Sequence, residues 1–195
     1  MSHSTDVALF IRWMRGGGAE RVTANIAAGL ARSGLQVNLV LLSEEGQYLS
    51  ELPPEVRIVD LNTRSLSNIG GIKLPTSFQA LGSLQKLTTY LKTVQPAVLL
   101  SATHYLNEVS VLAKRLARVP TRVIVSEHTT LSLEAQHTEY KSARFLPWTT
   151  RLVYPFADEI VAVSHGVAED LSQTARLGSK PIQVIYTGLT QDRYG

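Results

Sequence analysis

Cysteine is absent from the 195 residues of the sequence. Its absence excludes disulfide bonds and thiolate metal sites and is typical of a protein from a reducing compartment. The longest apolar runs, such as Ala97–Leu100 and Ile160–Val163, have the length of a strand and are too short to cross a membrane. Residues 1–13 lack the basic segment and the small-residue cleavage site of a signal peptide. We therefore expect a cytoplasmic protein.

Charged residues are also scarce, at 18% of the chain, whereas apolar residues make up 44%. This composition is that of a globular protein and argues against disorder. The net charge of +3 is a modest excess, and no dense basic patch or nucleic-acid-binding motif accompanies it. The length suits one substantial domain, and nucleic acid is not an expected partner.

Short β-rich runs alternate with longer helical patterns along the chain. Most of the β-rich runs are almost continuously apolar, which is typical of parallel strands covered on both faces. We expect an α/β fold with a Rossmann-like, doubly wound, mostly parallel sheet of about seven strands and helices on both faces. The expected strands are Val7–Trp13, Gln36–Leu42, Val56–Leu61, Ala97–Ala102, Arg122–Ser126, Glu159–Ser164 and Ile182–Tyr186.

Four helices are expected between these strands, at Ala19–Ser33, Phe78–Val94, Asn107–Arg118 and His165–Leu177. In the first, an apolar stripe of Val22, Ile26, Ala27 and Leu30 ends at Gly34, a residue suited to a helix C-terminus. In the second, the predicted stripe consists of Leu81, Leu84, Leu87 and Leu91. Residues 62–77 and 129–147 break the alternation, and we expect long, polar loops there.

Three consecutive glycines, Gly16 to Gly18, lie between the first expected strand and the first helix. This position is at the carboxyl end of the sheet, where open α/β folds bind ligands. A helix N-terminus offers free N–H groups and partial positive charge, and glycine lets a phosphate approach closely. The run therefore favours a phosphate-binding loop, with a plain tight turn as the alternative.

Three other motifs fit the sequence poorly. A dinucleotide-binding fingerprint needs glycine where Arg21 stands, and no Gly-Lys-Ser/Thr of a P-loop follows the run. The segment Ala162–Gly166 resembles a nucleophile elbow around Ser164, but no histidine follows His165 to complete a hydrolase triad. We interpret Ser164 as a helix N-cap.

Four segments, taken in order, resemble the family 4 glycosyltransferases. They are "GGGAERVTANIAAGLARSGLQVNLV", "VIVSEHTT", "ADEIVAVSHGVAEDL" and "VIYTGLTQDRYG". Together they cover nearly the whole chain, and the ordered set is more specific than any one of its members. The sequence departs from the family pattern at Leu35, where a histidine is usual, and at Thr187, where an asparagine is usual.

The resemblance implies the GT-B architecture, in which two Rossmann-like domains face a cleft. Residues 1–195 would form the single N-terminal, acceptor-side domain, without the C-terminal donor-binding domain. Such enzymes take part in polysaccharide biosynthesis and transfer a sugar from a nucleotide-diphosphate sugar to a hydroxyl acceptor, here on a glycan or a lipid, with retention of configuration. The isolated domain is expected to be inactive. The alternative from another class is a non-catalytic Rossmann-like module that binds a nucleotide or a phosphate.

The resemblance assigns one candidate site residue, and position at the sheet edge adds the others. His128, which follows the strand Arg122–Ser126, matches the family histidine that hydrogen-bonds the donor sugar, so it is the catalytic candidate. The candidates for donor or acceptor binding are Gly16, Gly17, Gly18, Glu20 and His104. For His128 a structural role is the alternative, for Glu20 the alternative is a purely helix-capping role at the positive end of the dipole, and His104 is a candidate only because it also follows a strand. No Asp-x-Asp motif is present, and the i, i+4 pairs His104–Glu108 and His165–Glu169 supply only two ligands each. No metal or other cofactor is expected, and the nucleotide sugar is a substrate.

A basic and aromatic segment at residues 140–156 suggests a peripheral contact with a membrane. Lys141, Arg144, Trp148 and Arg151 have the spacing to share one helical face, which suits anionic lipid or a charged acceptor. Pro147 is expected to interrupt that face, and a solvated basic segment is the alternative.

Overall fold

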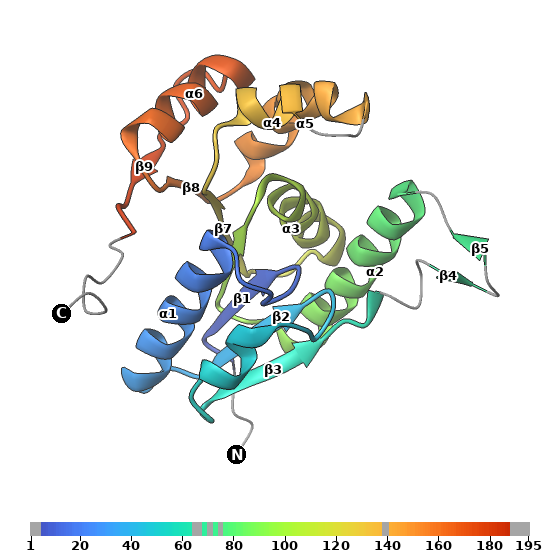
Figure 1. Cartoon of the computed structure of the whole chain (residues 1–195), viewed down its shortest axis with the longest axis vertical. Coiled ribbons are helices and arrows are strands. Elements are labelled where there is room, and N and C mark those ends of the chain that lie inside the picture. Colours follow the sequence, from blue (N-terminus) through green and yellow to red (C-terminus); the bar gives the residue numbers. More distant parts are fainter. Residues whose placement is uncertain (1–4, 64–67, 70–71, 74–75, 138–140, 188–195) are drawn as a thin grey trace.

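A single parallel sheet of seven strands forms the centre of the computed structural model, which describes residues 5–63, 68–69, 72–73, 76–137 and 141–187 (Figure 1). The strand order is β3-β2-β1-β6-β7-β8-β9. The bounds are Val7–Ile11 for β1, Val37–Leu41 for β2, Val56–Asp60 for β3, Val98–Ala102 for β6, Arg122–Glu127 for β7, Glu159–Ala162 for β8 and Gln183–Val184 for β9. The predicted Rossmann-like sheet is confirmed.

The strands form where the sequence is continuously apolar, because both faces of the sheet are covered. All five residues of β2 are buried, and Leu9 of β1 pairs with Leu39 of β2 in register. The chain builds outward from β1 through β2 to β3 and then returns to the other side of β1 with β6. This reversal creates a crevice between the carboxyl ends of β1 and β6, where doubly wound sheets bind ligands.

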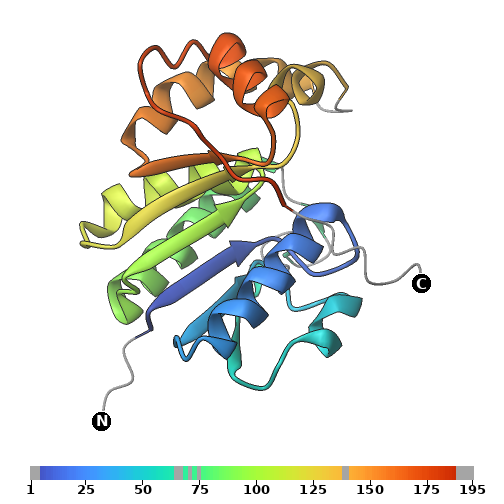
Figure 2. The same cartoon turned by 90° about the vertical axis from the view of Figure 1, so that its left-hand side faces the viewer.

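Helices pack on both faces of the sheet (Figure 2). Helix α1, Gly18–Arg32, contacts β1, β2 and β3 on one face, whereas α2, Thr76–Val94, and α3, His104–Ala117, lie side by side on the other. Helix α6, His165–Ala175, packs on β8 and β9, and α5, Leu146–Val153, packs beside α3. The shorter elements are η1 Gln47–Glu51, β4 Asn68–Ile69, β5 Ile72–Lys73, α4 Leu131–His137, η3 Lys141–Phe145 and η4 Tyr154–Phe156.

The prediction of a long loop at residues 129–147 is wrong. The segment contains α4 and η3 and leads directly into α5, and Leu131 at the start of α4 is buried in the core. Pro147 does not interrupt the helix but stands in its first turn, where a missing N–H needs no partner. Helix α4 is only seven residues long, too short for its hydrophobic periodicity to predict it.

Two further predictions, both in or just before α2, are wrong. Residues 62–77 include the β4–β5 hairpin and the start of α2, so they are not a continuous loop. Leu81 was placed on the buried stripe of α2, yet its side chain is 62% exposed, while Leu87 and Leu91 are buried as expected. Nearby, Asn38 of β2 donates a buried hydrogen bond to the hydroxyl of Tyr90 on α2, 2.8 Å away.

The first turns and buried faces of two helices also differ from the sequence-based expectation. Helix α3 begins at His104, not Asn107, so His104 belongs to its first turn. In α1 the buried residues are small (Thr23, Ala24, Ala27 and Ala31), and only Ala27 belongs to the predicted stripe. Small side chains let this helix lie close to the sheet, while Val22, Ile26 and Leu30 are only half-buried.

Candidate active site

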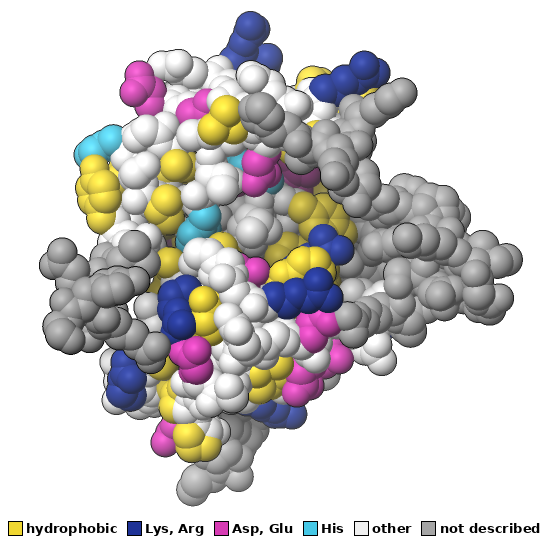
Figure 3. All heavy atoms as spheres, in the orientation of Figure 1, with side chains coloured by type: hydrophobic (Ala, Val, Ile, Leu, Met, Phe, Trp, Pro, Cys, Tyr) yellow, Lys and Arg dark blue, Asp and Glu magenta, His cyan; other side chains and the backbone are white. Residues whose placement is uncertain are grey.

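Chemically active side chains gather at the carboxyl edge of the sheet. The loop after β1 carries residues 12–17, α3 follows β6 with Thr103 and His104, and His128 follows β7 directly. Figure 3 shows a hollow in the middle of this side of the molecule, with histidine and acidic side chains at its rim. Since parallel strands all end at this edge, segments far apart in sequence meet here.

The glycine loop, residues 16–18, connects this edge to α1. Gly16 has φ +145°, a backbone conformation that favours glycine, whereas Gly17 is the N-cap of α1 with φ −79°. A Cβ on Gly18 would meet no atom within 4 Å, and all three residues are exposed. The backbone conformation therefore requires glycine only at Gly16, a Cβ on Gly17 would lie 2.2 Å from Glu20 Oε2, and a Cβ on Gly18 would enter open space.

Another glycine, Gly46, lies against the backbone of Met14 just before the glycine loop, and the sequence analysis did not predict its role. Its φ is +123°, and a Cβ there would lie 2.0 Å from the backbone carbon of Met14. The close approach lets the Met14 N–H donate to the Glu45 carbonyl at 2.8 Å and the Tyr48 N–H donate to the Met14 carbonyl at 3.1 Å. The only sequence signal was the turn-forming segment Ser43–Gly46 after the second strand.

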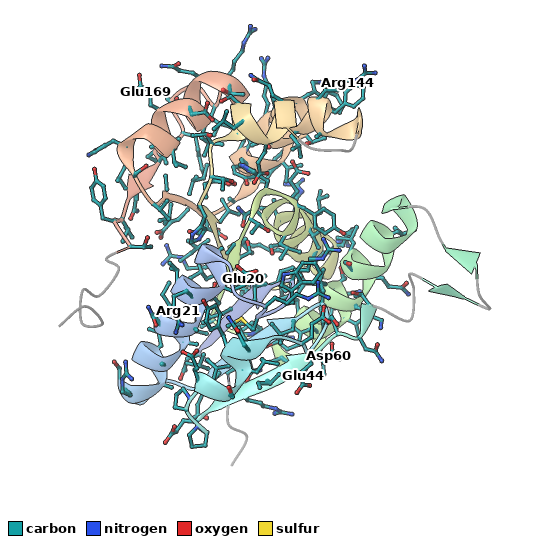
Figure 4. All side chains as sticks on the ribbon, viewed as in Figure 1. Glu20, Arg21, Glu44, Asp60, Arg144 and Glu169 are labelled. Carbon is teal, nitrogen blue, oxygen red and sulfur yellow. The ribbon has the colours of Figure 1, made fainter. Side chains whose placement is uncertain are left out.

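His128 lies half-buried beside the glycine loop and α1. Its Nε2 is 3.1 Å from the Ser126 hydroxyl. Burial lowers the pKa of His128 below its ordinary value, and the negative charges of Glu127 and of Glu20 on α1 oppose this without reversing it. The side chain is therefore neutral near pH 7, and Glu20 lies close enough for its charge to affect the pKa of His128. Figure 4 shows Glu20 pointing into the centre of this edge.

His104 has a different environment, because its side chain is only 2% exposed. Its Nδ1 lies 2.7 Å from a Glu127 carboxylate oxygen, and its Nε2 lies 3.6 Å from Glu134 of α4. Burial alone would lower the pKa of His104, but Glu127, with Glu134 and Glu108, outweighs burial and raises it. His104 is therefore held against Glu127, with which it forms an ion pair when the ring is protonated, and it does not line the surface of the hollow.

Glu127 is the centre of a buried polar network that the sequence did not predict. One carboxylate oxygen accepts hydrogen bonds from the Tyr154 hydroxyl and from Asn107 Nδ2, the latter at 2.9 Å. Asn107 also donates to the Ser126 carbonyl and accepts from Ser101, at 3.0 and 2.7 Å. Burial and the Glu127 charge raise the pKa of Tyr154 well above 10, so its hydroxyl remains protonated. A glutamate at the end of an apolar strand was the available signal.

A neighbouring carboxylate, Glu108 of α3, ties that helix to α5. It accepts hydrogen bonds from the hydroxyls of Thr149 and Thr150, at 2.7 and 3.2 Å. Burial raises its pKa, and the two hydroxyls only partly offset the effect. Glu108 is thus engaged by α5 and does not join His104 in a metal site, and the described residues contain no group of three potential metal-binding side chains.

A pocket of about 200 Å³ lies at the switch point between β1 and β6. It is lined by Arg12, Leu42, Thr63, Ser83, Thr103, Tyr105 and Leu106. The Arg12 guanidinium stacks on the Trp13 ring at 4.2 Å, and Thr103 has φ +83°, which is a strained conformation for a β-branched residue. A larger hollow of about 510 Å³ runs along α2 and has none of the predicted site residues in its lining.

Ser164 and His165 lie at the end of β8, away from this network. The Ser164 hydroxyl accepts a 3.2 Å hydrogen bond from the Val167 N–H, which confirms the predicted N-cap of α6. His165 is exposed, and its ring meets the edge of Tyr186. The nucleophile-elbow interpretation thus finds no support in the geometry.

Comparison with known proteins decides the family. Residues 16–193 match Glycosyltransferase Family 4. The chain belongs to glycosyltransferase family 4. The match includes the glycine loop, His104 and His128, whereas Arg12 of the pocket lies just before the matched residues.

One curated relative and two solved structures are similar to this chain, the structures in fold alone. An N-acetylgalactosamine-N,N'-diacetylbacillosaminyl-diphospho-undecaprenol 4-alpha-N-acetylgalactosaminyltransferase of Campylobacter jejuni is 29% identical over 193 residues, which are 97% of this chain and 49% of that protein. The lipopolysaccharide outer core galactosyltransferase WaaB has a similar fold, with a TM-score of 0.65 at 15% identity, over 94% of this chain and 46% of that chain. Anabaena HepE in complex with UDP and glucose gives a TM-score of 0.63 at 18% identity, over 94% and 44% of the two chains.

The family 4 chain described here spans about half the length of the curated relative that it matches. It has one Rossmann-like sheet, whereas the GT-B fold of the family consists of two such domains. The fold of this chain is thus that of one half of a GT-B enzyme.

Proposed function

We propose that this family 4 chain is the acceptor-binding, N-terminal half of a retaining glycosyltransferase. The enzyme would move a sugar from a nucleotide-diphosphate sugar to a hydroxyl group on a glycan or a lipid-linked acceptor, with the donor held between this chain and a donor-binding domain outside residues 1–195. The observation that carries the proposal is the meeting of the glycine loop, His128 and the Arg12 pocket at one sheet edge. The Campylobacter relative, named for a diphospho-undecaprenol substrate, supports a lipid-linked acceptor.

The glycine loop has the features of a diphosphate site. Gly17 is the N-cap of α1 and Gly18 is its first residue, so their N–H groups belong to the positive end of the helix dipole, and Gly18 has open space on its Cα side. Negative charge grows on the diphosphate as the sugar leaves it. Donors that are already fixed around that charge stabilise the transition state more than the ground state.

His128 and Glu20, which lie near each other at the sheet edge, would face the reacting sugar. A neutral His128 can donate a hydrogen bond to a sugar hydroxyl, and Glu20 can accept one from the acceptor. The acceptor oxygen would bond to the sugar carbon on the face from which the diphosphate departs. The electron pair of the broken bond goes to the diphosphate, and the hydroxyl proton goes to a departing phosphate oxygen.

His104 takes a positioning role in this scheme, since its ring is buried against Glu127. The contact between His104 and Glu127 joins the first turn of α3 to the end of β7, and that turn carries Tyr105 into the pocket. His104 would therefore act on the acceptor through the placement of its neighbours and not by direct contact.

The Arg12 pocket would hold the part of the acceptor next to the reacting hydroxyl. Its volume of about 200 Å³ is small for a whole ligand and suits one sugar ring or one phosphate group. Arg12 supplies the positive charge for a phosphate, and Tyr105 supplies a hydroxyl beside it. This arrangement fits an acceptor whose sugar is joined to a lipid through phosphate.

Replacement of Arg12 by alanine tests the proposal in the enzyme that contains both domains. We expect the KM for an undecaprenyl-diphosphate-linked acceptor to rise about tenfold or more, with the KM for the nucleotide sugar unchanged, because a charge-assisted hydrogen bond to phosphate is lost. Arg15→Ala is the matched control, since Arg15 also stacks on Trp13 at 4.2 Å but does not line the pocket. Equal acceptor KM values for both variants would refute the assignment of the pocket.

A further inference from the structure

The segment that includes α5 and η4 has its polar and apolar sides reversed. Thr150 and Tyr154 are completely buried and bind Glu108 and Glu127, while the outer side carries large apolar residues. These are Phe145, Trp148, Leu152 and Phe156, with 52%, 62%, 49% and 51% of their surface exposed. A helix on a protein surface normally turns its apolar side inward. Packing in the core therefore does not explain why the outer side of this segment is apolar.

The four residues form one continuous surface, which we call the α5 face. Their spacings of three, four and four residues place them on the same side of the helical turns from η3 through η4. Helix α3 packs against α5 and η4, and it also exposes two leucines, Leu112 and Leu116, which are 39% and 58% exposed. Four large apolar side chains exposed along one segment are more than the single exposed leucines found on most surfaces.

Three positively charged side chains, all arginines, border this surface. Arg115 lies over the Phe156 ring at 4.0 Å, and Arg144 lies over the Phe145 ring at 4.9 Å. Arg151 is exposed on α5, and no carboxylate in the described ranges forms an ion pair with any of the three. Figure 4 shows Arg144 pointing outward at the end of this segment. Aromatic and leucine side chains surrounded by unpaired arginines are the pattern of surfaces that rest on anionic lipid.

We propose that the α5 face is a membrane-docking surface for anionic phospholipid. The apolar side chains enter the headgroup boundary, and Arg115, Arg144 and Arg151 contact lipid phosphates. No helix of the described ranges is long and apolar enough to cross a bilayer, so the contact lies on the membrane surface. This inference rests on the proposed function in one respect. The proposed lipid-linked acceptor lies in a membrane, and this would be the reason for the protein to dock there.

Vesicle binding of the 195-residue chain tests the proposal without any sugar transfer. We expect the chain to sediment with vesicles that contain phosphatidylglycerol and phosphatidylcholine and to bind weakly to phosphatidylcholine alone. Loss of each arginine charge should weaken binding about fivefold, so Arg144→Gln/Arg151→Gln should weaken it about thirtyfold at low salt. Trp148→Ser/Leu152→Ser should reduce binding at all salt concentrations, whereas Trp148→Phe should retain it.

The matched control is Arg32→Gln/Leu35→Ser, which removes one exposed arginine and one exposed leucine at the far end of α1. This control should bind vesicles like the unchanged chain. Thermal unfolding should be unchanged in all variants, because every replaced side chain is exposed. Brominated lipid should quench the fluorescence of Trp148, and the quenching should disappear in Trp148→Phe.

Two outcomes would overturn the proposal. One is equal vesicle binding by the α5-face variants, the control and the unchanged chain. The other is a dimer in light scattering that the α5-face variants abolish, with no binding to anionic vesicles, which would make the face a contact between two copies. Neither result depends on sugar transfer, so failure of docking and failure of the proposed function are distinguishable.

Discussion

Replacement of Tyr154 by phenylalanine removes a single hydroxyl group but should clearly destabilise the protein. Tyr154 is fully buried, and its hydroxyl is one of the groups that donate to the buried Glu127 carboxylate. Removal leaves that oxygen with Asn107 Nδ2 at 2.9 Å. A hydrogen bond to a charged group contributes about 1.5–3 kcal/mol. For a domain of this size, a loss of about 2 kcal/mol lowers Tm by about 4–8 °C.

Tyr90→Phe is the matched comparison, because its hydroxyl accepts a buried bond from the neutral amide of Asn38 at 2.8 Å. Loss of a neutral bond costs about 1 kcal/mol, or about 2–4 °C in Tm. Both variants should be measured by thermal and urea unfolding, with unchanged urea m-values. If Tyr154→Phe were no less stable than Tyr90→Phe, the Glu127 network would not contribute as described.

Three further predictions concern the glycines, the histidines and the isolated chain. Gly46→Ala and Gly16→Ala should destabilise the fold, and Gly46→Ala should do so more severely. Gly18→Ala should instead stabilise the fold by up to about 1 kcal/mol in urea unfolding. The same variant should lower transfer activity, because the added Cβ would enter the diphosphate space. Because the pKa of His104 is raised in the folded protein, the stability that His104 contributes is complete below about pH 6.5 and is lost as pH rises through the folded pKa. Because the pKa of His128 is lowered, His128 destabilises the folded protein as pH falls below about 6.5. His104→Gln should therefore lose stability relative to the unchanged chain from pH 8 to pH 5.5 (roughly the range over which histidine titrates), and His128→Gln should gain it; slopes of the same sign would contradict the assignment. The chain alone should unfold cooperatively and transfer no sugar from common nucleotide sugars, and turnover by residues 1–195 would refute the two-domain proposal.

The sequence predicted the sheet well because parallel strands covered on both faces are almost purely apolar. Val37–Leu41 is an example, since each of its residues is buried and the sequence pattern is unbroken. The predicted strand Val7–Trp13 extended too far, because Arg12 and Trp13 belong to the loop that carries the pocket. Segments with few apolar residues, such as α4, were missed, because tertiary contacts and not local periodicity determine them.

The candidate site was predictable where a backbone feature marks it and not where burial decides the chemistry. The glycine run and the position of His128 after its strand could be identified from the sequence. The Glu127 network could not, since Asn107 and Tyr154 lie 20 and 27 residues from Glu127 in sequence. His104 has the same limit, because only the fold shows that its ring faces a carboxylate instead of the hollow.

The central claim is that His128 binds the reacting sugar, and one kinetic measurement tests it most directly. In the enzyme with both domains, kcat and KM for the nucleotide sugar should be measured for His128→Ala together with Tm, with His165→Ala as the control on an exposed histidine. Loss of a hydrogen bond formed in the transition state should lower kcat about 10²-fold with little change in KM or Tm. A lower Tm with the kcat of the unchanged enzyme would contradict the claim and make His128 a structural residue.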